Sequence, residues 1–329
     1  MPASNRHPGT RSRITEFLTR ALCAAAAGFW LVAGSAFAQT YGFATLQPGA
    51  LSYSMGSAIA KVFKENEGMN ILVQPQGGDN VLVPMVGRGE IEVGIATAPE
   101  LHSQVAGGKL PDLRLIGTIN QLRLGVWVRK DAPMKTIADL KGKRVVMGYS
   151  AMRVIDEVSR GILASGGLNE NDVTPVLVPN VNRGAEEFVA GATDMFAHAY
   201  GAPKVREADA AVGGIRQLTF DEKGMIAARK ISPWGYLTLV DPSPVYIGVA
   251  QPMNVYTIDN MLFTSAKVPD EFVYKFIEAL EKHRIELGKI VPALGDFSAA
   301  AAYKKYDVPY HPGALKYFKA RNIEVRALP

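Results

Sequence analysis

Short runs of β-branched and apolar residues alternate with stretches of helical periodicity along most of this 329-residue chain. This alternation constrains the fold most, because it is typical of α/β units on a mainly parallel sheet with flanking helices. The runs that predict strands are 71–73, 93–96, 124–128 and 144–147. We therefore expect an α/β protein, long enough for about two domains.

Three stretches have the periodicity of helices with one buried face. In the first, the buried face consists of Met55, Ala58, Ile59, Val62 and Phe63. A second helix should follow the strand 144–147, with Ala151, Ile155, Val158 and Ile162 inward. The third runs from Asp270 to Leu287, with Phe272, Phe276, Ala279 and Leu280 inward.

Residues 1–38 have the order of charge and hydrophobicity of a secretory signal. Four arginines accompany the apolar stretch 21–34, and Ala36-Phe37-Ala38 offers small residues at a cleavage site. A membrane anchor is the alternative, but the apolar stretch is shorter than the ~20 residues needed to cross a bilayer. We expect a mature chain that begins at Gln39 and resides in the periplasm.

The mature chain would contain no thiol, because Cys23 is the only cysteine. A disulfide, a thiolate metal site and a cysteine nucleophile are then excluded. Without the four arginines and Glu16 of residues 1–38, the net charge falls from +5 to +2. A balance so near neutral argues against nucleic acid as a partner.

No motif of an enzyme or a cofactor site is present. The five histidines include no pair at metal-ligand spacing, and no nucleophile elbow, phosphate-binding loop or dinucleotide fingerprint occurs. His198 follows the apolar run 195–197, where it could contact a ligand. We expect a protein without catalytic activity, cofactor or metal.

Three loops that precede helices are the candidate ligand-binding segments. In open α/β sheets, ligands bind at the carboxyl ends of strands, where helix amino termini present free N–H groups. Ordinary turn and helix-capping chemistry is the alternative for each loop. The candidate contacts, to which we add Thr97 and His198 at strand ends, are Gln47, Leu51, Ser52, Tyr53, Gln76, Asp79, Asn80, Tyr149, Ser150, Met152 and Arg153.

Two of these residues have specific alternatives. Asp79 is either the N-cap of a helix or a cleft residue that favours a ligand with an ammonium or hydroxyl group. Arg153, with Ser150 as N-cap, would lie in a first helical turn, where the helix dipole disfavours a cation. It either binds a ligand carboxylate or is solvated or paired with Asp156 or Glu157.

A short sequence pattern occurs twice in the chain, at residues 86–93 and at residues 188–195. In both, an apolar helix end is followed by a glycine, an acid and an apolar strand. Gly89 and Gly191 suit the left-handed position that ends a helix. Two lobes of like construction would produce this pattern, and so would chance repetition of a common helix-to-strand connection.

Six segments resemble motifs of a known protein family: 49–53, Gly77-Gly78-Asp79, 89–95, 139–145, 191–196 and Gly201-Ala202-Pro203. The family is the TAXI class of extracytoplasmic binding proteins, which serve TRAP transporters. The resemblance runs from about Thr40 to about Leu280. One departure occurs at 148–153, where the family usually has further glycines and this chain has Ser150-Ala151-Met152-Arg153.

The resemblance implies a type II periplasmic binding protein, with two α/β lobes joined by a two-strand hinge. Lobe 1 would comprise 39–125 and 262–329, and lobe 2 would comprise 126–261. The crossings would lie near Gly125-Val126 and Ile258 to Leu262. The implied function is capture of a small organic acid, a carboxylate or an amino acid, by a monomer that delivers it to TRAP membrane subunits. The alternatives are a binding protein for an ATP-driven or tricarboxylate-type transporter and an exported enzyme on the same fold.

Overall fold

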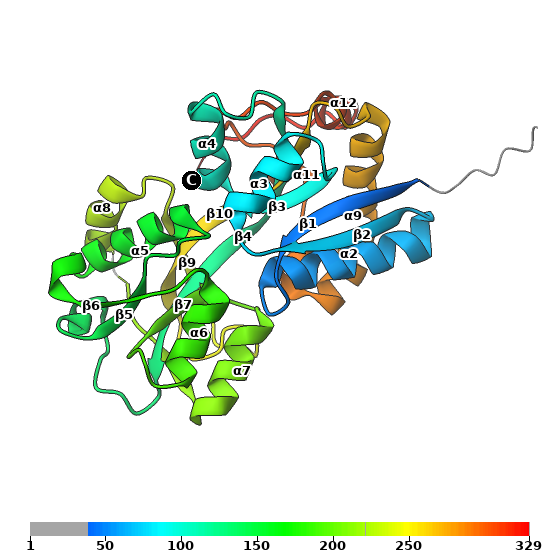
Figure 1. Cartoon of the computed structure of the whole chain (residues 1–329). Coiled ribbons are helices and arrows are strands. Elements are labelled where there is room, and N and C mark those ends of the chain that lie inside the picture. Colours follow the sequence, from blue (N-terminus) through cyan, green and yellow to red (C-terminus); the bar gives the residue numbers. More distant parts are fainter. Residues whose placement is uncertain (1–38, 221, 329) are drawn as a thin grey trace, which may run out of the picture. The chain divides into compact units, whose positions relative to one another are not determined.

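The computed structural model describes residues 39–220 and 222–328, and residues from Thr40 onward form one compact unit. The predicted signal segment, 1–38, lies outside the described residues. Strands and helices alternate as the sequence predicts, so the chain is an α/β protein (Figure 1). Within the described ranges, no helix is both long and apolar enough to cross a membrane.

The first βα group covers residues 40–106. Its parallel strands lie in the order β2, β1, β3, with β3 next to the antiparallel strand β10. All five residues predicted for the buried face of the first helix are buried in α2. The elements are β1 (Thr40–Leu46), α2 (Leu51–Glu67), β2 (Asn70–Gln76), α3 (Asp79–Gly87), β3 (Val93–Thr97) and α4 (Ala98–Ala106).

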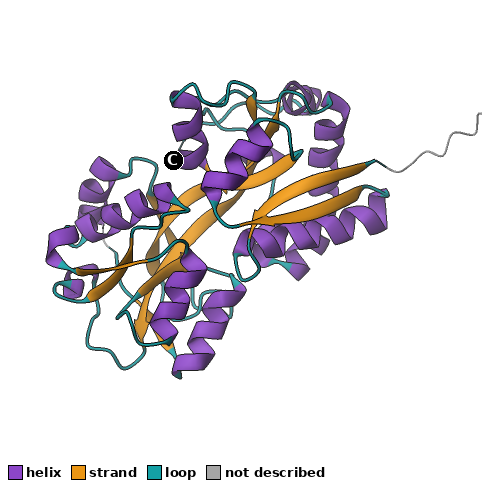
Figure 2. Cartoon of the chain, in the orientation of Figure 1, coloured by secondary structure: helices purple, strands orange, loops and turns teal. Residues whose placement is uncertain are grey.

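The second βα group covers residues 144–212 and has the same order of elements. Its strands β5 and β6 are parallel, and β7 pairs with the antiparallel strand β4. Figure 2 shows helices flanking the strands in both groups. The elements are β5 (Arg144–Met147), α5 (Arg153–Ser165), β6 (Thr174–Leu177), α6 (Val181–Val189), β7 (Phe196–Ala199) and α7 (Pro203–Val212).

The two groups share the helix-to-strand connection that the repeated sequence pattern at 86–93 and 188–195 indicates. Gly89 and Gly191 both have φ of 78°, the left-handed conformation that closes α3 and α6. The acid that follows then accepts a hydrogen bond from the first strand of its group: Gly42 N–H donates to Glu92 (2.5 Å), and Arg144 N–H donates to Asp194 (2.8 Å). The two groups therefore share this connection in three dimensions as well as in sequence.

Two long strands join the groups. β4 (Leu113–Arg129) and β10 (Met253–Ser265) pair antiparallel from Leu113 with Ser265 to Leu124 with Tyr256. Beyond that pairing, β4 continues against β7 and β8 (Ile215–Gln217), while β10 pairs with β3 and β9 (Tyr236–Val240). The sheet is therefore mixed rather than mainly parallel. Our expected hinge segments lie in β4 and β10, and a hinge there stays a proposal.

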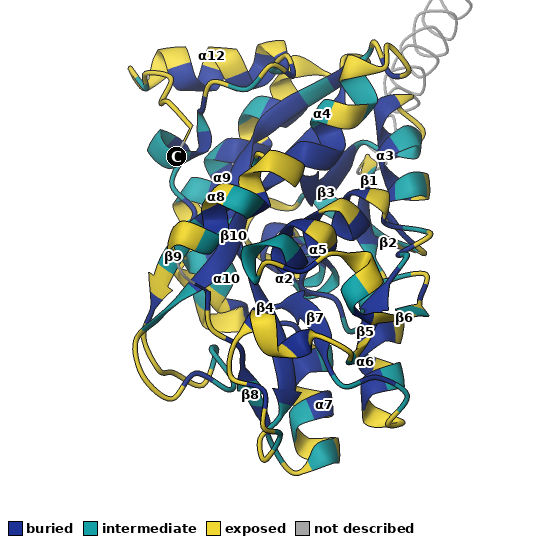
Figure 3. Ribbon diagram, turned by 90° about the vertical axis from the view of Figure 1, so that its left-hand side faces the viewer, coloured by how far each residue is buried: buried dark blue, intermediate teal, exposed yellow. Residues whose placement is uncertain are grey.

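The C-terminal segment packs mainly on the first group. α9 (Asp270–Ile290) brings Phe276 against Phe43 and Phe63, and Phe272 stacks on Tyr41 with ring centroids 3.7 Å apart. The predicted inward residues of this helix are all buried. Figure 3 shows α12 (Pro312–Ala320) with one buried and one exposed face. The remaining elements are α8 (Glu222–Ile231), α10 (Pro292–Gly295), α11 (Ala299–Ala302) and the 3₁₀ turns 137–140 and 170–172.

Candidate functional site

Loops from the two groups meet through hydrogen bonds. The side chain of Asn80, in the first turn of α3, donates to the carbonyl of Ser150 (2.8 Å), and its backbone N–H donates to Ala151 (3.3 Å). Gly78 lies so close to Ala151 that an added Cβ would stand 2.2 Å from the Ala151 carbonyl oxygen. The loop before α3 and the loop before α5 are therefore in direct contact.

A second set of hydrogen bonds joins the loop before α2 to the second group. Asn182, in the first turn of α6, donates from its side chain to the carbonyl of Pro48 (3.0 Å). The backbone N–H of Lys204 donates to the carbonyl of Gly49 (3.2 Å). Contacts between the groups thus form on both sides of the space behind the loops.

That space is a pocket of about 60 Å³, here called the inter-loop pocket. Residues of both groups line it, and strands β4 and β10 supply Leu122, Leu124 and Asn260. Six of the predicted contacts line it: Leu51, Ser52, Asp79, Thr97, Met152 and His198. The complete lining is Leu46, Ala50, Leu51, Ser52, Asp79, Ile95, Ala96, Thr97, Leu122, Leu124, Met152, Ile155, Val181, His198, Ala199 and Asn260.

The other predicted contacts do not line the inter-loop pocket. Gln47 borders a smaller space next to it, of about 10 Å³, together with Met152. Asn80 and Ser150 lie at the contact between the loops, where Ser150 contributes its carbonyl oxygen. Tyr53 and Gln76 are half-buried elsewhere, and Gln76 donates to the carbonyl of Gln74 (3.4 Å).

Tyr149 is a core residue. Its side chain is fully buried, and its backbone has φ of 21°, an unusual value for a residue other than glycine. Burial raises the pKa of its hydroxyl. The structure therefore places this side chain inside the second group and not in the inter-loop pocket.

Asp79 is not a helix N-cap. Gly78 occupies the N-cap position, and Asp79 is the first residue of α3, with only 4% of its surface exposed. The pKa of Asp79 is raised to about 8, mainly by burial and to a lesser extent by the negative charge of Glu100. The capping interpretation is wrong because the extended Gly78 holds the N-cap position, and the Asp79 side chain makes no capping hydrogen bond and lines the pocket.

Hydroxyl groups stand beside this carboxyl in the pocket lining. The hydroxyl oxygen of Ser52 accepts a hydrogen bond from Leu46 N–H (3.2 Å), so its own proton remains available. The hydroxyl of Thr97 is buried and has no hydrogen-bond partner among the described residues. Asn260 donates to the Asn120 side chain (3.2 Å) and is already engaged. Ser52 and Thr97 therefore have hydroxyl protons that are free to bind a ligand.

His198 is neutral, and each of its two ring nitrogens forms one hydrogen bond. Its Nδ1 accepts from Ala199 N–H (2.9 Å), so the proton resides on Nε2, which donates to Asn182 Oδ1 (3.0 Å). Burial lowers the pKa of His198 to about 4. A histidine held neutral in this way positions Asn182 for its bond to Pro48 and is a poor general base near neutral pH.

Ser150 is not the N-cap of α5, because Met152 occupies that position and Arg153 begins the helix. The Arg153 side chain is exposed and makes no hydrogen bond or ion pair with another described residue. Asp156 pairs instead with Arg160 (2.8 Å). The positive charge of Arg153 acts on the buried Glu100 of α4, where it opposes the rise in pKa that burial causes. A role of Arg153 in ligand binding stays a prediction.

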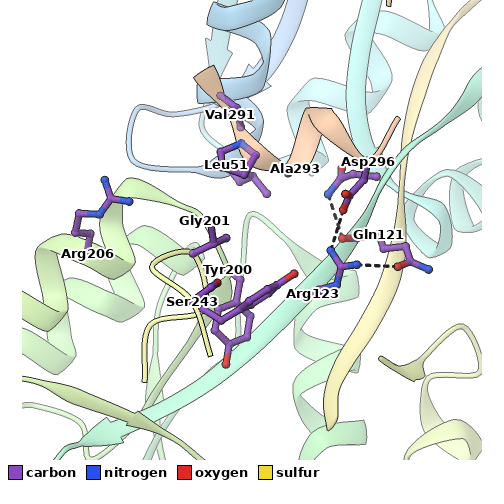
Figure 4. Close-up of a pocket in the computed structure, with 14 residues that line it drawn as sticks. Leu51, Gln121, Arg123, Tyr200, Gly201, Arg206, Ser243, Val291, Ala293 and Asp296 are labelled. Atoms are coloured by element: carbon purple, nitrogen blue, oxygen red, sulfur yellow. Dashed lines mark hydrogen bonds and ion pairs between the residues drawn. The ribbon is translucent and has the colours of Figure 1, made fainter. Parts of the chain in front are cut away.

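A larger pocket, of about 190 Å³, lies on the other side of Leu51 and is here called the arginine pocket. Figure 4 shows Arg123 hydrogen-bonded to Asp296 (3.2 Å) and Gln121 (3.0 Å), with Arg206 pointing away from it. No sequence signal marks Arg123, because it lies inside β4 and belongs to no motif. Asp296 pairs with Arg123, but the Arg123 Nε–H is buried without a partner among the described residues, and the exposed Arg206 also lines this pocket.

No group of three or more metal-ligating side chains comes together within residues 39–220 and 222–328. The candidate site is therefore an apolar pocket with one buried acid, two hydroxyls and a neutral histidine. Such a lining can bind and orient a small molecule.

Solved structures of similar fold have low sequence identity to this chain. One, described as a periplasmic transporter, is 13% identical, covers 88% of this chain and 94% of its own, and has a TM-score of 0.58. The periplasmic binding protein BugD is 11% identical, covers 87% and 99%, and has a TM-score of 0.54. The fold of this chain is that of type II periplasmic binding proteins.

Sequence comparison finds a partial relative and a family. A putative thiamine biosynthesis protein of Haemophilus influenzae is 33% identical over 139 residues, which is 40% of this chain and 43% of that protein. The match thus spans less than half of the relative's length. The model of the NMT1-like family matches residues 43–321, nearly the whole described chain. The chain belongs to the NMT1-like family.

Proposed function

We propose that this protein is an exported solute-binding protein that captures a small molecule in the inter-loop pocket and delivers it to a membrane transporter. One observation carries the proposal: loops from two similar βα groups meet by hydrogen bonds directly over a pocket that both groups line. Two strands, β4 and β10, connect the groups, and bending there would separate the loops and admit the solute.

The proposed ligand class remains a small organic acid or amino acid. Helix amino termini at Leu51, Asp79 and Arg153 surround the site and favour a negatively charged group. The proposed binding unit is a monomer, with lobes at 39–125 plus 262–329 and at 126–261.

The transporter class is a finer proposal than the binding function. The TAXI-like motifs support a TRAP transporter, and an ATP-driven transporter is the alternative. Solute uptake into vesicles that contain candidate membrane subunits, measured with this protein added, would decide between the two transporter classes. Uptake driven by an ion gradient without ATP supports the TRAP class, whereas a strict ATP requirement supports the alternative.

Thermal denaturation with a panel of amino acids, mono- and dicarboxylates, keto acids and sugars tests the binding function. A ligand that prefers the folded form raises the melting temperature by mass action. Met152→Trp should abolish that shift because the larger ring fills the pocket, which admits only a few small groups. Leu72→Trp on the exposed edge of β2 is the matched control and should bind normally. Binding that survives Met152→Trp, or catalytic turnover of the ligand, would argue against this function.

A further inference from the structure

The inter-loop pocket contains an acid and no basic side chain that is charged near neutral pH. Of the sixteen residues that line it, only Asp79 and His198 can titrate, and His198 is held neutral. No lysine or arginine belongs to the lining. A bound molecule would therefore meet a carboxyl group for which the pocket lining supplies no cationic partner.

The Asp79 carboxyl lacks the partners that a buried carboxylate normally has. No hydrogen bond from another described residue reaches it, and the charged group that acts on its pKa is a second buried acid, Glu100. Glu100 receives a hydrogen bond from Gln104 on one oxygen, and its other oxygen has no partner among the described residues. Burial of a charge without a partner is strongly unfavourable, so Asp79 holds a proton in the free protein, and its ionised form needs a cationic group from outside the chain.

The cations nearest in the fold do not complete the site. Arg153 is exposed at the start of α5 and acts on Glu100 rather than on Asp79. Lys204 is paired with Glu207 (2.8 Å) and lies 3.6 Å from Glu186. Neither side chain lines the inter-loop pocket.

We infer that the ligand of the inter-loop pocket carries a cationic nitrogen, and that this nitrogen pairs with Asp79 while Thr97 and Ser52 bind neighbouring polar atoms. The inference rests on the proposed binding function and narrows it. Among the proposed ligand classes it selects amino acids and other amines over acids that lack a basic nitrogen. The pocket volume of about 60 Å³ suits a small head group such as a primary ammonium.

The way in which ligand affinity changes with pH distinguishes a cationic ligand from one that accepts a hydrogen bond from Asp79. The free protein holds a proton on Asp79 below about pH 8. A cation binds the ionised form, so binding releases that proton and affinity rises with pH until about 8. A ligand that accepts a hydrogen bond from protonated Asp79 would show the reverse. The other groups that bear on this titration are Glu100 on α4, His198 on β7 and Arg153 on α5.

The test uses three probes of matched size on the mature protein: propylammonium, propionamide and propionate. Concentrations must reach about 10 mM because ligands this small bind weakly. Only propylammonium should raise the melting temperature. Its affinity should rise about tenfold per pH unit between pH 6 and 8, a range in which an alkylammonium keeps its charge.

Asp79→Asn should weaken propylammonium binding by at least about 30-fold, the loss typical of removing one partner of a buried charge pair. Asp131→Asn, which alters an exposed acid, should bind as the wild type does. A melting shift with propionate alone, or equal binding by Asp79→Asn, overturns the inference. If a carboxylate or sugar binds and Met152→Trp abolishes that binding, the inference of a cationic ligand fails while the solute-binding function stands. If no probe or panel compound binds, both fail.

Discussion

Asp79 should make the stability of the folded protein fall as the pH rises. Its pKa is about 8 in the folded state and near 3.9 in an unfolded chain, so between these values the folded state holds one more proton. The free energy of unfolding then decreases by up to ~1.4 kcal/mol per pH unit in that window. The contribution is complete below about pH 4 and lost at about pH 8.

Asp79→Asn should remove this dependence. The amide cannot ionise, so the variant should be more stable than the wild type at pH 8, with a smaller difference at pH 5. Urea unfolding at pH 5, 6, 7 and 8 measures both proteins, with Asp131→Asn as the control that follows the wild type. Parallel pH profiles for Asp79→Asn and the wild type would show that Asp79 is ionised in the folded protein.

His198 should stay neutral over the range in which an exposed histidine titrates. Its pKa is lowered to about 4 by burial, and its proton lies on Nε2. Nitrogen NMR of the ring should show the Nε2–H form unchanged between pH 5 and 8, with His198→Asn used to assign the signals. A ring that gains a proton near pH 6.5 would contradict the geometry described for this side chain.

The sequence predicted the loops around the inter-loop pocket and six of its lining residues, but not the side chains that the long strands supply. The position of Asp79 after two glycines left capping and ligand binding open, and the decision depends on which residue holds the N-cap position. Leu122 and Asn260 were missed because they lie in the middle of long strands, far in sequence from any loop. Their contribution depends on the pairing of β4 with β10, which no local pattern specifies.

At the scale of elements, the loop before α3 must fit closely against the loop before α5. A Cβ at Gly78 would overlap the Ala151 carbonyl, whereas a Cβ at Gly77 would have no atom within 4 Å. Neither glycine adopts the left-handed conformation, so an alanine at either position introduces no backbone strain.

Gly78→Ala should therefore keep the two loops apart and weaken ligand binding by about tenfold or more, since even 1.4 kcal/mol of steric cost has that effect. Gly77→Ala is the matched control and should bind like the wild type. Calorimetry with whichever solute the panel identifies measures the affinities, and circular dichroism verifies folding. Equal affinities for both variants would show that contact between these loops is not needed for binding.

The start of α5 shows why a sequence signal can misplace an element. Ser150 is a favoured capping residue, yet its backbone N–H donates to Val178 O (3.2 Å) in the neighbouring loop. Met152 N–H donates to Tyr149 O (2.7 Å), which forms a turn, and the helix begins only at Arg153. Tertiary hydrogen bonds thus outweigh the local capping preference. The strands and most residues of the helix faces were predicted correctly because their apolar periodicity reflects burial itself. Ala151 is the exception, because it precedes α5 and is half-buried.

At the scale of the whole molecule, a buried ion pair ties the C-terminal segment to the connecting strand β10. Asp259 accepts hydrogen bonds from Lys304, Tyr306 and Tyr236 (2.8 Å), and it is 4% exposed. These donors come from the C-terminal segment and from β9. The position of β10 between the two groups is therefore fixed from both sides.

Lys304→Met should destabilise the protein by about 3–5 kcal/mol, because the Asp259 charge stays buried without its cation. Lys305→Met, at the exposed neighbouring position, should have little effect. Adding Asp259→Asn to Lys304→Met should restore part of the loss, since the uncompensated charge is removed. Urea unfolding measures all four proteins, and a loss below about 1 kcal/mol for Lys304→Met would indicate that the two tyrosines suffice.

The hydrogen bonds between the loops bear on how long a captured solute remains bound. Asn80 and Asn182 together with the Lys204 backbone form four such bonds, and a typical bond contributes about 0.5–1.5 kcal/mol net. In the proposed function these bonds must break both to admit a solute and to release it, so they slow both steps and lengthen the residence time. A transporter that unloads the protein would then have to supply this work, most directly by competing for the carbonyls of Pro48 and Ser150.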